Sequence, residues 1–294
     1  MADATLSGAI VTTPPQSYGR RVVKRFFKHK LAVTGLVFLL LLAIVVIVGP
    51  WLSPYEFDQQ DWELIGMPGP MSPAHWLGTD ELGRDALTRL IYGGRVSLAV
   101  GLAGAIIATI LGTLIGALSG FFRGWVDVVL MRFTDVMLSI PTLPLVLLLS
   151  GIFRPSPPLL VSIVGALIWM GTARLVRSQF LSLREREFVE AARALGAGPA
   201  RLMFRHILPN AIGPITVAAT LAVGSAVMME SALSFLGFGI QPPVPTWGNL
   251  LNSASSWLSV APWLAIPPGL CILFTVLAVN FLGDGLRDAM EPKE

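Results

Sequence analysis

The sequence predicts an all-α integral membrane protein with six transmembrane helices, on the evidence of its composition, its apolar runs and its charge distribution. Of the 294 residues, 54% are hydrophobic and only 13% are charged, and the mean hydropathy is +0.70. Water-soluble domains carry about 25% charged and about 45–50% apolar residues. Because this excess of apolar side chains is too large for one water-soluble core, the bilayer is the natural solvent for the chain.

The predicted spans are apolar runs of about 20 residues, the length that crosses the hydrocarbon core. Six runs reach or nearly reach this length, namely residues 31–52, 96–121, 126–152, 159–181, 211–236 and 263–286. The first run has a basic front, as a signal peptide does. However, it is long for the apolar part of a signal peptide, and Gly49-Pro50-Trp51 offers no small-x-small cleavage site. We therefore expect it to be retained as the first span.

The charges predict the orientation, because cytoplasmic loops carry an excess of Lys and Arg. Basic residues cluster at 19–30 and 174–205, whereas the segment after the first span is acidic. Both termini are therefore predicted to be cytoplasmic. The chain is expected to begin with an N-terminal tail at residues 1–30 and the first transmembrane helix at 31–52. An extracytoplasmic segment follows at 53–94, with a short amphipathic helix capped at Thr79-Asp80. A core of five transmembrane helices at 95–288, with a charged loop at 185–210, precedes a C-terminal tail at 289–294.

Several classes of function are not expected. The net charge of +3 comes from bases that flank apolar runs, which is a pattern of membrane flanks and not of a nucleic-acid groove. Cys271 is the only cysteine, and His29, His75 and His206 are far apart in sequence, so we expect no metal site. The sequence contains no Gly-x-x-x-x-Gly-Lys-Ser/Thr phosphate loop and no catalytic Ser-His-Asp or Cys-His set. We therefore expect no cofactor and no catalytic residue on this chain.

Small residues and prolines inside the predicted spans indicate how the helices pack. Gly112, Gly116 and Gly120 are four residues apart, so they share one helix face and allow another backbone to approach closely. Prolines are expected to bend or break the third, fifth and sixth spans, at Pro141 and Pro144, Pro214, and Pro267-Pro268. Broken helices occur beside translocation paths and also in purely structural spans.

Three charged residues lie inside predicted spans. Arg132 and Asp135 are three residues apart, so they share a helix face and can form an ion pair, either as a structural pair or as a gate or latch between helices. Glu230 has no evident partner within a helical turn. We expect it to face a subunit interface or a water-filled cavity.

The loop between the fourth and fifth spans is charged and amphipathic. Its apolar positions Phe188, Ala192, Leu195 and Leu202 follow helical spacing. Glycines at 196 and 198, followed by Pro199, predict a helix, a turn and a second helix. From periodicity alone, such a hairpin is equally compatible with lying on anionic lipid and with docking into a groove of a partner protein.

The residues of this loop resemble the EAA loop of ABC importer permeases. That family pattern reads EAA, three residues, Gly, nine residues, Ile, one residue, Leu-Pro. Here Glu190-Ala191-Ala192, Gly196 and Leu208-Pro209 have the same spacing, although His206 stands at the usual Ile position, with Ile207 next to it. The resemblance implies that this loop docks into the ATPase subunit, through Glu190, Ala191, Ala192, Gly196, Arg201, Leu208 and Pro209.

Further motifs are similar to the C-type permeases of dipeptide, oligopeptide and nickel importers, over nearly the whole chain after about Arg20. They are Leu77-Gly78-Thr79-Asp80, Gly83-Arg84-Asp85, Leu233-Ser234-Phe235-Leu236-Gly237, Trp247-Gly248, and Asn280 with Gly283-Asp284-Gly285-Leu286-Arg287-Asp288. The resemblance implies the type I ABC importer permease fold in a bacterial cytoplasmic membrane. It also implies the partners: a second permease, two ATPase subunits that hold ATP and Mg, and an extracytoplasmic solute-binding protein.

The substrate does not follow from the sequence. Peptides are the first choice by family size, and nickel or another small solute is the alternative within the family. An ion-coupled secondary transporter is an alternative of another class, in which Asp135 and Glu230 would be the coupling carboxylates. An integral membrane enzyme would need a catalytic cluster at one depth, and none is present in the sequence.

Overall fold

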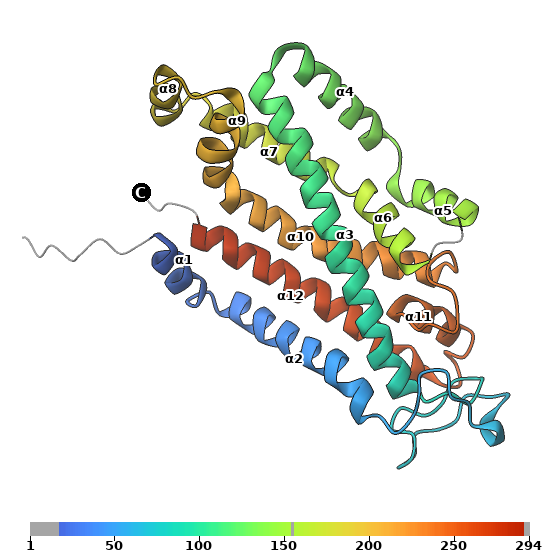
Figure 1. Cartoon of the computed structure of the whole chain (residues 1–294). Helices are drawn as coiled ribbons and strands as arrows, with labels where there is room; N and C mark the ends of the chain where they lie inside the picture. Colours follow the sequence, from blue (N-terminus) through green and yellow to red (C-terminus); the bar gives the residue numbers. More distant parts are fainter. Residues whose placement is uncertain (1–17, 154–155, 291–294) are drawn as a thin grey trace, which may run out of the picture.

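The computed structural model describes residues 18–153 and 156–290, and these are helical apart from loops and two isolated β-bridges (Figure 1). Parts of both predicted tails, residues 1–17 and 291–294, lie outside the described residues. Within the described residues, four helical stretches are long and apolar enough to cross a membrane: α2 (Lys30–Leu52), α3 (Ala86–Phe122), Pro199–Phe235 and Pro262–Met290.

Two bent pairs of helices pass the same test of length and composition. The first joins α4 (Gly124–Ser139) to α5 (Thr142–Phe153) with a bend of 83°, and the second joins α6 (Pro157–Leu167) to α7 (Met170–Leu183) with a bend of 46°. The described chain therefore has four candidate spans, or up to six if each bent pair crosses once. This is an all-helical membrane fold.

Shorter elements complete the described chain. They are α1 (Tyr18–Phe26), α8 (Glu187–Ala194), α9 (Pro199–Arg201), the π-helical segment η2 (Leu202–Ile207), α10 (Leu208–Phe235), α11 (Trp247–Ser255), α12 (Ile266–Met290), and the 3₁₀ turns η1 (Trp62–Leu64) and η3 (Pro262–Leu264). The helix α1 lies within the region predicted to be a tail. Its Phe26 is buried against Ala32 and Ala289, and this apolar contact holds α1 against the end of α12.

The position of α3 at the centre of the bundle explains much of the packing. Its Val100 lies in a core cluster with Leu160 and Val164 of α6 and Leu233 of α10. In Figure 1, α3 runs the length of the bundle, from the loops near α11 to the neighbourhood of α8. The end with α8 also carries α1 and the end of α12, and we call it the α8 end.

The separate short amphipathic helix predicted in residues 53–94 does not form. Instead, α3 begins at Ala86 and continues without a break to Phe122, because Asp85 caps it by accepting a hydrogen bond from the Thr88 N–H at 2.8 Å. No proline separates these first turns from the following span, and the helix continues through Gly93 and Gly94. The predicted cap residues, Thr79 and Asp80, bond within the preceding loop instead.

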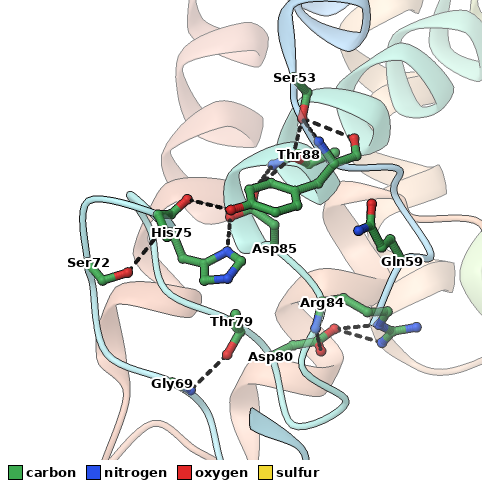
Figure 2. A network of polar contacts seen from close by, with 12 residues as sticks. Ser53, Gln59, Gly69, Ser72, His75, Thr79, Asp80, Arg84, Asp85 and Thr88 are labelled. Atoms are coloured by element: carbon green, nitrogen blue, oxygen red, sulfur yellow. Dashed lines mark hydrogen bonds and ion pairs between the residues drawn. The ribbon is translucent and has the colours of Figure 1, made fainter. Parts of the chain in front are cut away.

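That loop, the 53–85 segment, is a hydrogen-bonded unit at the opposite end from α8 (Figures 1 and 2). Asp80 accepts hydrogen bonds from the backbone N–H groups of Leu82 and Arg84 at 3.0 Å each, and it forms an ion pair with the Arg84 guanidinium at 2.7 Å. Asp85 contacts the His75 ring at 2.9 Å and the Thr88 hydroxyl at 2.7 Å. Because these charges are buried against one another, the segment has a defined structure without regular secondary structure.

The prolines act differently from one span to the next. As predicted, the third span is interrupted beside Pro141 and Pro144, where α4 ends at Ser139 and α5 begins at Thr142. By contrast, α10 continues through Pro214, and Pro267 and Pro268 lie in the first turn of α12. A first turn has no intrahelical use for the proline N–H, so no break results there. The break between α6 and α7, at Ile168 and Trp169, contains no proline and was not predicted.

Candidate functional site

The candidate coupling loop is a helical hairpin at the α8 end of the bundle. Helix α8 ends in a turn in which the Gly196 N–H donates to the Arg193 carbonyl at 2.9 Å and the Ala197 N–H donates to the Ala192 carbonyl at 3.0 Å. This is the Schellman arrangement, and it places Gly196 at a φ of 83°, which side chains of L residues rarely adopt. Pro199 then begins α9 at its first position. The observed order is the predicted helix, turn and helix.

The hairpin is fixed to the bundle through one face of α8. Val189 is fully buried, and it lies in one apolar cluster with Met203, Ile207 and Phe180 of α7. By contrast, Phe188 is 41% exposed and Leu195 is 89% exposed. Leu195 lies outside the helical period because α8 ends at Ala194. Ala192 and Leu202 do face the cluster.

The outer face of the hairpin is open. Glu190, Ala191, Gly196 and Arg201 are exposed, and the Glu190 side chain has no hydrogen bond or ion pair among the described residues. The hairpin therefore offers an exposed carboxylate at Glu190 and an exposed apolar side chain at Leu195, both of which a groove on a partner protein can bind.

The Leu208-Pro209 part of the motif lies where the hairpin joins α10. The Leu208 N–H donates to the Met203 carbonyl, five residues earlier, which closes the π-helical turn of η2. Pro209 has no N–H to continue the α-helical pattern, and π-helical turns are frequent at functional sites. The Asn210 side-chain amide donates to the His206 carbonyl at 2.7 Å, which adds a contact within this turn.

The three glycines of α3 lie against α7. A Cβ atom at Gly112 would stand 2.7 Å from the Trp169 carbonyl oxygen, and one at Gly120 would stand 2.7 Å from the Arg177 carbonyl oxygen. Gly116, between them, approaches the backbone at Ala173 more closely still. Side chains at these positions would therefore push the two helices apart.

The predicted pair between Arg132 and Asp135 does not form. Asp135 instead accepts a hydrogen bond from the Arg174 guanidinium of α7 at 2.6 Å, and Arg132 is exposed without an ion pair among the described residues. The spacing of three residues does allow the two side chains to share a face, but a partner on the neighbouring helix lies closer to Asp135. Sequence spacing along α4 could not reveal this partner, which is 39 residues away.

The expectation for Glu230 is also wrong. The residue is fully buried inside this chain and is not on a surface for another subunit. Its carboxylate accepts hydrogen bonds from the Ser97 hydroxyl of α3 at 2.8 Å and the Ser234 hydroxyl at 2.7 Å. The Trp247 N–H at the start of α11 donates to the same Ser97 hydroxyl at 3.2 Å. Glu230 therefore connects α10 to α3 and α11.

The comparisons with known proteins cover almost the whole chain. The family model for the binding-protein-dependent transport system inner membrane component matches residues 112–294. The model for the N-terminal TM domain of oligopeptide transport permease C matches residues 17–68.

Curated relatives agree with the family models. The chain is 42% identical over 271 residues to the oligopeptide transport system permease protein OppC of Haemophilus influenzae, covering 92% of this chain and 87% of that relative. It is 44% identical over 271 residues to OppC of Escherichia coli K12, covering 92% and 90%. It is 40% identical over 277 residues to the dipeptide transport system permease protein DppC of Alkalihalophilus pseudofirmus, covering 93% and 90%. The chain therefore belongs to the family of binding-protein-dependent transport system inner membrane components.

Proposed function

We propose that this chain is a permease subunit of a binding-protein-dependent ABC importer that moves dipeptides or oligopeptides across a bacterial cytoplasmic membrane. The names of the relatives, oligopeptide and dipeptide transport permeases, support this substrate class. The chain supplies one half of the pathway, and a second permease supplies the other. ATP binds and is hydrolysed on two separate ATPase subunits, and a solute-binding protein delivers the peptide outside.

The proposed topology has six spans, with each bent pair crossing once and both termini in the cytoplasm. The α8 end, where the basic residues of α1 and of the hairpin lie, is then cytoplasmic, in agreement with the excess of Lys and Arg on that side. The 53–85 segment is extracytoplasmic. An even number of crossings also puts α1 and the C-terminal end of α12 on the same side of the membrane. In Figure 1 both lie at the α8 end of the bundle.

The observation that carries the proposal is the exposed hairpin of α8 and α9. Val189 on its inner face packs against the bundle, whereas the side chains of Glu190 and Leu195 are exposed. This arrangement favours docking into a cleft of the ATPase subunit through the outer face. Closure of the ATPases on ATP would pull such hairpins together and convert the permease pair from inward-open to outward-open, which is a rigid-body change between two states.

Reversal of the charge at Glu190 tests the docking. In the complete importer reconstituted into vesicles, Glu190→Lys should insert and fold normally, because the side chain is exposed, but should abolish peptide uptake and the stimulation of ATP hydrolysis. Glu190→Asp is the matched control and should retain most of the uptake. Unchanged peptide uptake in Glu190→Lys would rule out the docking role of the hairpin.

The ion-coupled alternative requires a carboxylate that exchanges an ion with water in the membrane. Glu230 is fully buried and accepts hydrogen bonds from two serine hydroxyls, and Asp135 is paired with Arg174. Neither geometry favours the exchange of an ion with water. Within the importer family, nickel or another small solute is the alternative cargo. Identification of the ligand on the cognate binding protein separates peptides from nickel.

A further inference from the structure

We propose that three ion pairs between α4 and α7 form a ladder that positions α4 and carries movement of the coupling hairpin into the membrane. The residues are positioning residues for transport, and the inference rests on the function proposed above. We call these three pairs the α4–α7 ladder: Asp135 with Arg174, Asp127 with Arg177, and Arg123 with Glu185.

The three pairs of the ladder are equally short. Each pair has a nitrogen–oxygen distance of 2.6 Å, and the middle pair is bidentate, with both carboxylate oxygens of Asp127 bonded to the Arg177 guanidinium. From the first pair to the last, the residue numbers fall from Asp135 in α4 to Arg123 just before it. The numbers of their partners rise from Arg174 in α7 to Glu185 just after it. The pairs therefore connect two antiparallel segments in order, and Glu185 in the last pair is two residues before α8 begins.

Little of α4 is buried. Within α4, which is described throughout, Thr134 is the one buried residue, whereas its apolar side chains at Val129, Phe133 and Val136 are 52–59% exposed. The helix α7 buries five residues over a similar length. The apolar contacts of α4 with its neighbours include the stacking of Phe133 on Trp169, with ring centroids 6.1 Å apart, and the packing of Met137 against two core clusters. Because these apolar contacts lie in the second half of α4, the pairs of Asp127 and Arg123 are the specific contacts that set its first half beside α7.

The chain turns sharply at both ends of α4. At one end, α4 meets α5 with the bend of 83°. At the other end, Arg123 and Gly124 both have positive φ values, 57° and 54°, so the chain reverses sharply between α3 and α4. A helix between two such turns can change its angle without any helical hydrogen bond being broken.

The turn between α3 and α4 is also tied directly to the end of α7. The Arg184 guanidinium donates to the Phe121 carbonyl and lies 5.5 Å from the centre of the Phe121 ring. The Ser119 hydroxyl donates to Asp127, which joins the last turn of α3 to the middle pair of the ladder. A displacement of the chain at Glu185, at the start of the hairpin, therefore reaches Arg123 and the adjoining end of α4.

The last pair can be tested by exchanging its charges. The complete importer with its binding protein would be reconstituted with Arg123→Glu, with Glu185→Arg, and with both substitutions, and the peptide transported per ATP hydrolysed would be measured. Each single variant should still hydrolyse ATP when the ATPases dock, but the ratio of transport to hydrolysis should fall about tenfold. The double variant should restore the ratio to at least about half of its native value. An unchanged ratio in the single variants, or a double variant no better than they are, would overturn the proposal.

A distance measurement provides a second test that does not depend on turnover. Spin labels at Val129→Cys on α4 and Ser178→Cys on α7, both exposed sites, would be placed in a Cys271→Ser background that removes the only cysteine. In the assembled importer the native ladder should give one narrow distance distribution, and Arg123→Gln should broaden or split it. Identical distributions would show that the last pair does not hold α4.

The outcomes separate this inference from the proposed function. If Glu190→Lys leaves peptide uptake unchanged, the docking role of the hairpin fails, and the ladder then has no hairpin movement to carry. If Glu190→Lys abolishes uptake while the Arg123 and Glu185 variants keep the native ratio of transport to hydrolysis, only the ladder fails.

Discussion

The charged residues at the two ends of the bundle are arranged in opposite ways. In the 53–85 segment and the first turn of α3, Asp80, Arg84, Asp85 and Arg89 are 3–7% exposed and are paired with one another or with polar groups of the segment. In the hairpin at the α8 end, Glu190 and its charged neighbours are exposed. These four buried charges are therefore paired within the chain, whereas the exposed charges of the hairpin remain available to a partner.

This difference separates a region that is held together by internal pairs from one that is open to a partner. Buried ion pairs carry a large desolvation cost that close pairing and hydrogen bonds offset, and removal of one partner leaves the other charge buried and unpaired. The hairpin is fixed through a small apolar contact around Val189 and offers the rest of its surface. Substitutions in the 53–85 segment should therefore change stability, and substitutions in the hairpin should change function.

The largest effect is expected for Asp80→Ala. Removal of this carboxylate leaves the Arg84 and Arg89 guanidinium groups buried without their partner, which costs about 3–5 kcal/mol. Thermal unfolding of the detergent-solubilised protein measures the loss. The exposed Glu56→Ala is the control and should unfold at the native temperature. If Asp80→Ala is as stable as the control, the internal pairing does not hold the segment together.

An intermediate effect is expected for Gly196→Ala in the hairpin. No atom lies within 4 Å of the added Cβ, so the cost is the left-handed backbone conformation alone, about 1–2 kcal/mol. Hydrogen exchange of the α8 amides should become faster while global unfolding stays unchanged. Gly198 also has open space around it but has a φ of −68°, so Gly198→Ala should leave the exchange unchanged. Equal exchange rates in the two variants would contradict the assigned turn.

The smallest effect on stability is expected for Leu195→Ser. Because this side chain is 89% exposed, the free energy of unfolding should change by less than about 0.5 kcal/mol. If Leu195 enters a cleft of the ATPase, the apparent affinity for the ATPase subunits should still fall about tenfold, which corresponds to about 1.4 kcal/mol. Titration of the permease pair with ATPase subunits measures this. A lowered unfolding temperature with native affinity would show that Leu195 serves the fold.

The sequence predicts the local features of this molecule better than the long-range ones. The long apolar runs became α2, α3, α10 and α12, and Gly196 followed by Pro199 predicted the hairpin, because spans and turns depend on neighbouring residues. The break near Trp169 has no proline to signal it.

Contacts between distant residues were the main failure. Asp135 finds Arg174 and Glu230 finds Ser97, which are 39 and 133 residues away, and no spacing within one helix indicates such a partner. In the hairpin, helical spacing does not extend to Leu195, because α8 ends at Ala194.

The unbroken length of α3 gives the two contrasting ends a mechanical relation. Its 37 residues measure about 55 Å, well beyond the roughly 30 Å of the hydrocarbon core. Asp85 stands at one tip and Arg123 at the other. A stiff rod of this length that pivots by about 5° at one tip moves the other tip by roughly 5 Å. A rotation of α3 by that angle about its first turn would therefore displace Arg123, at the start of α4, by nearly one helical turn.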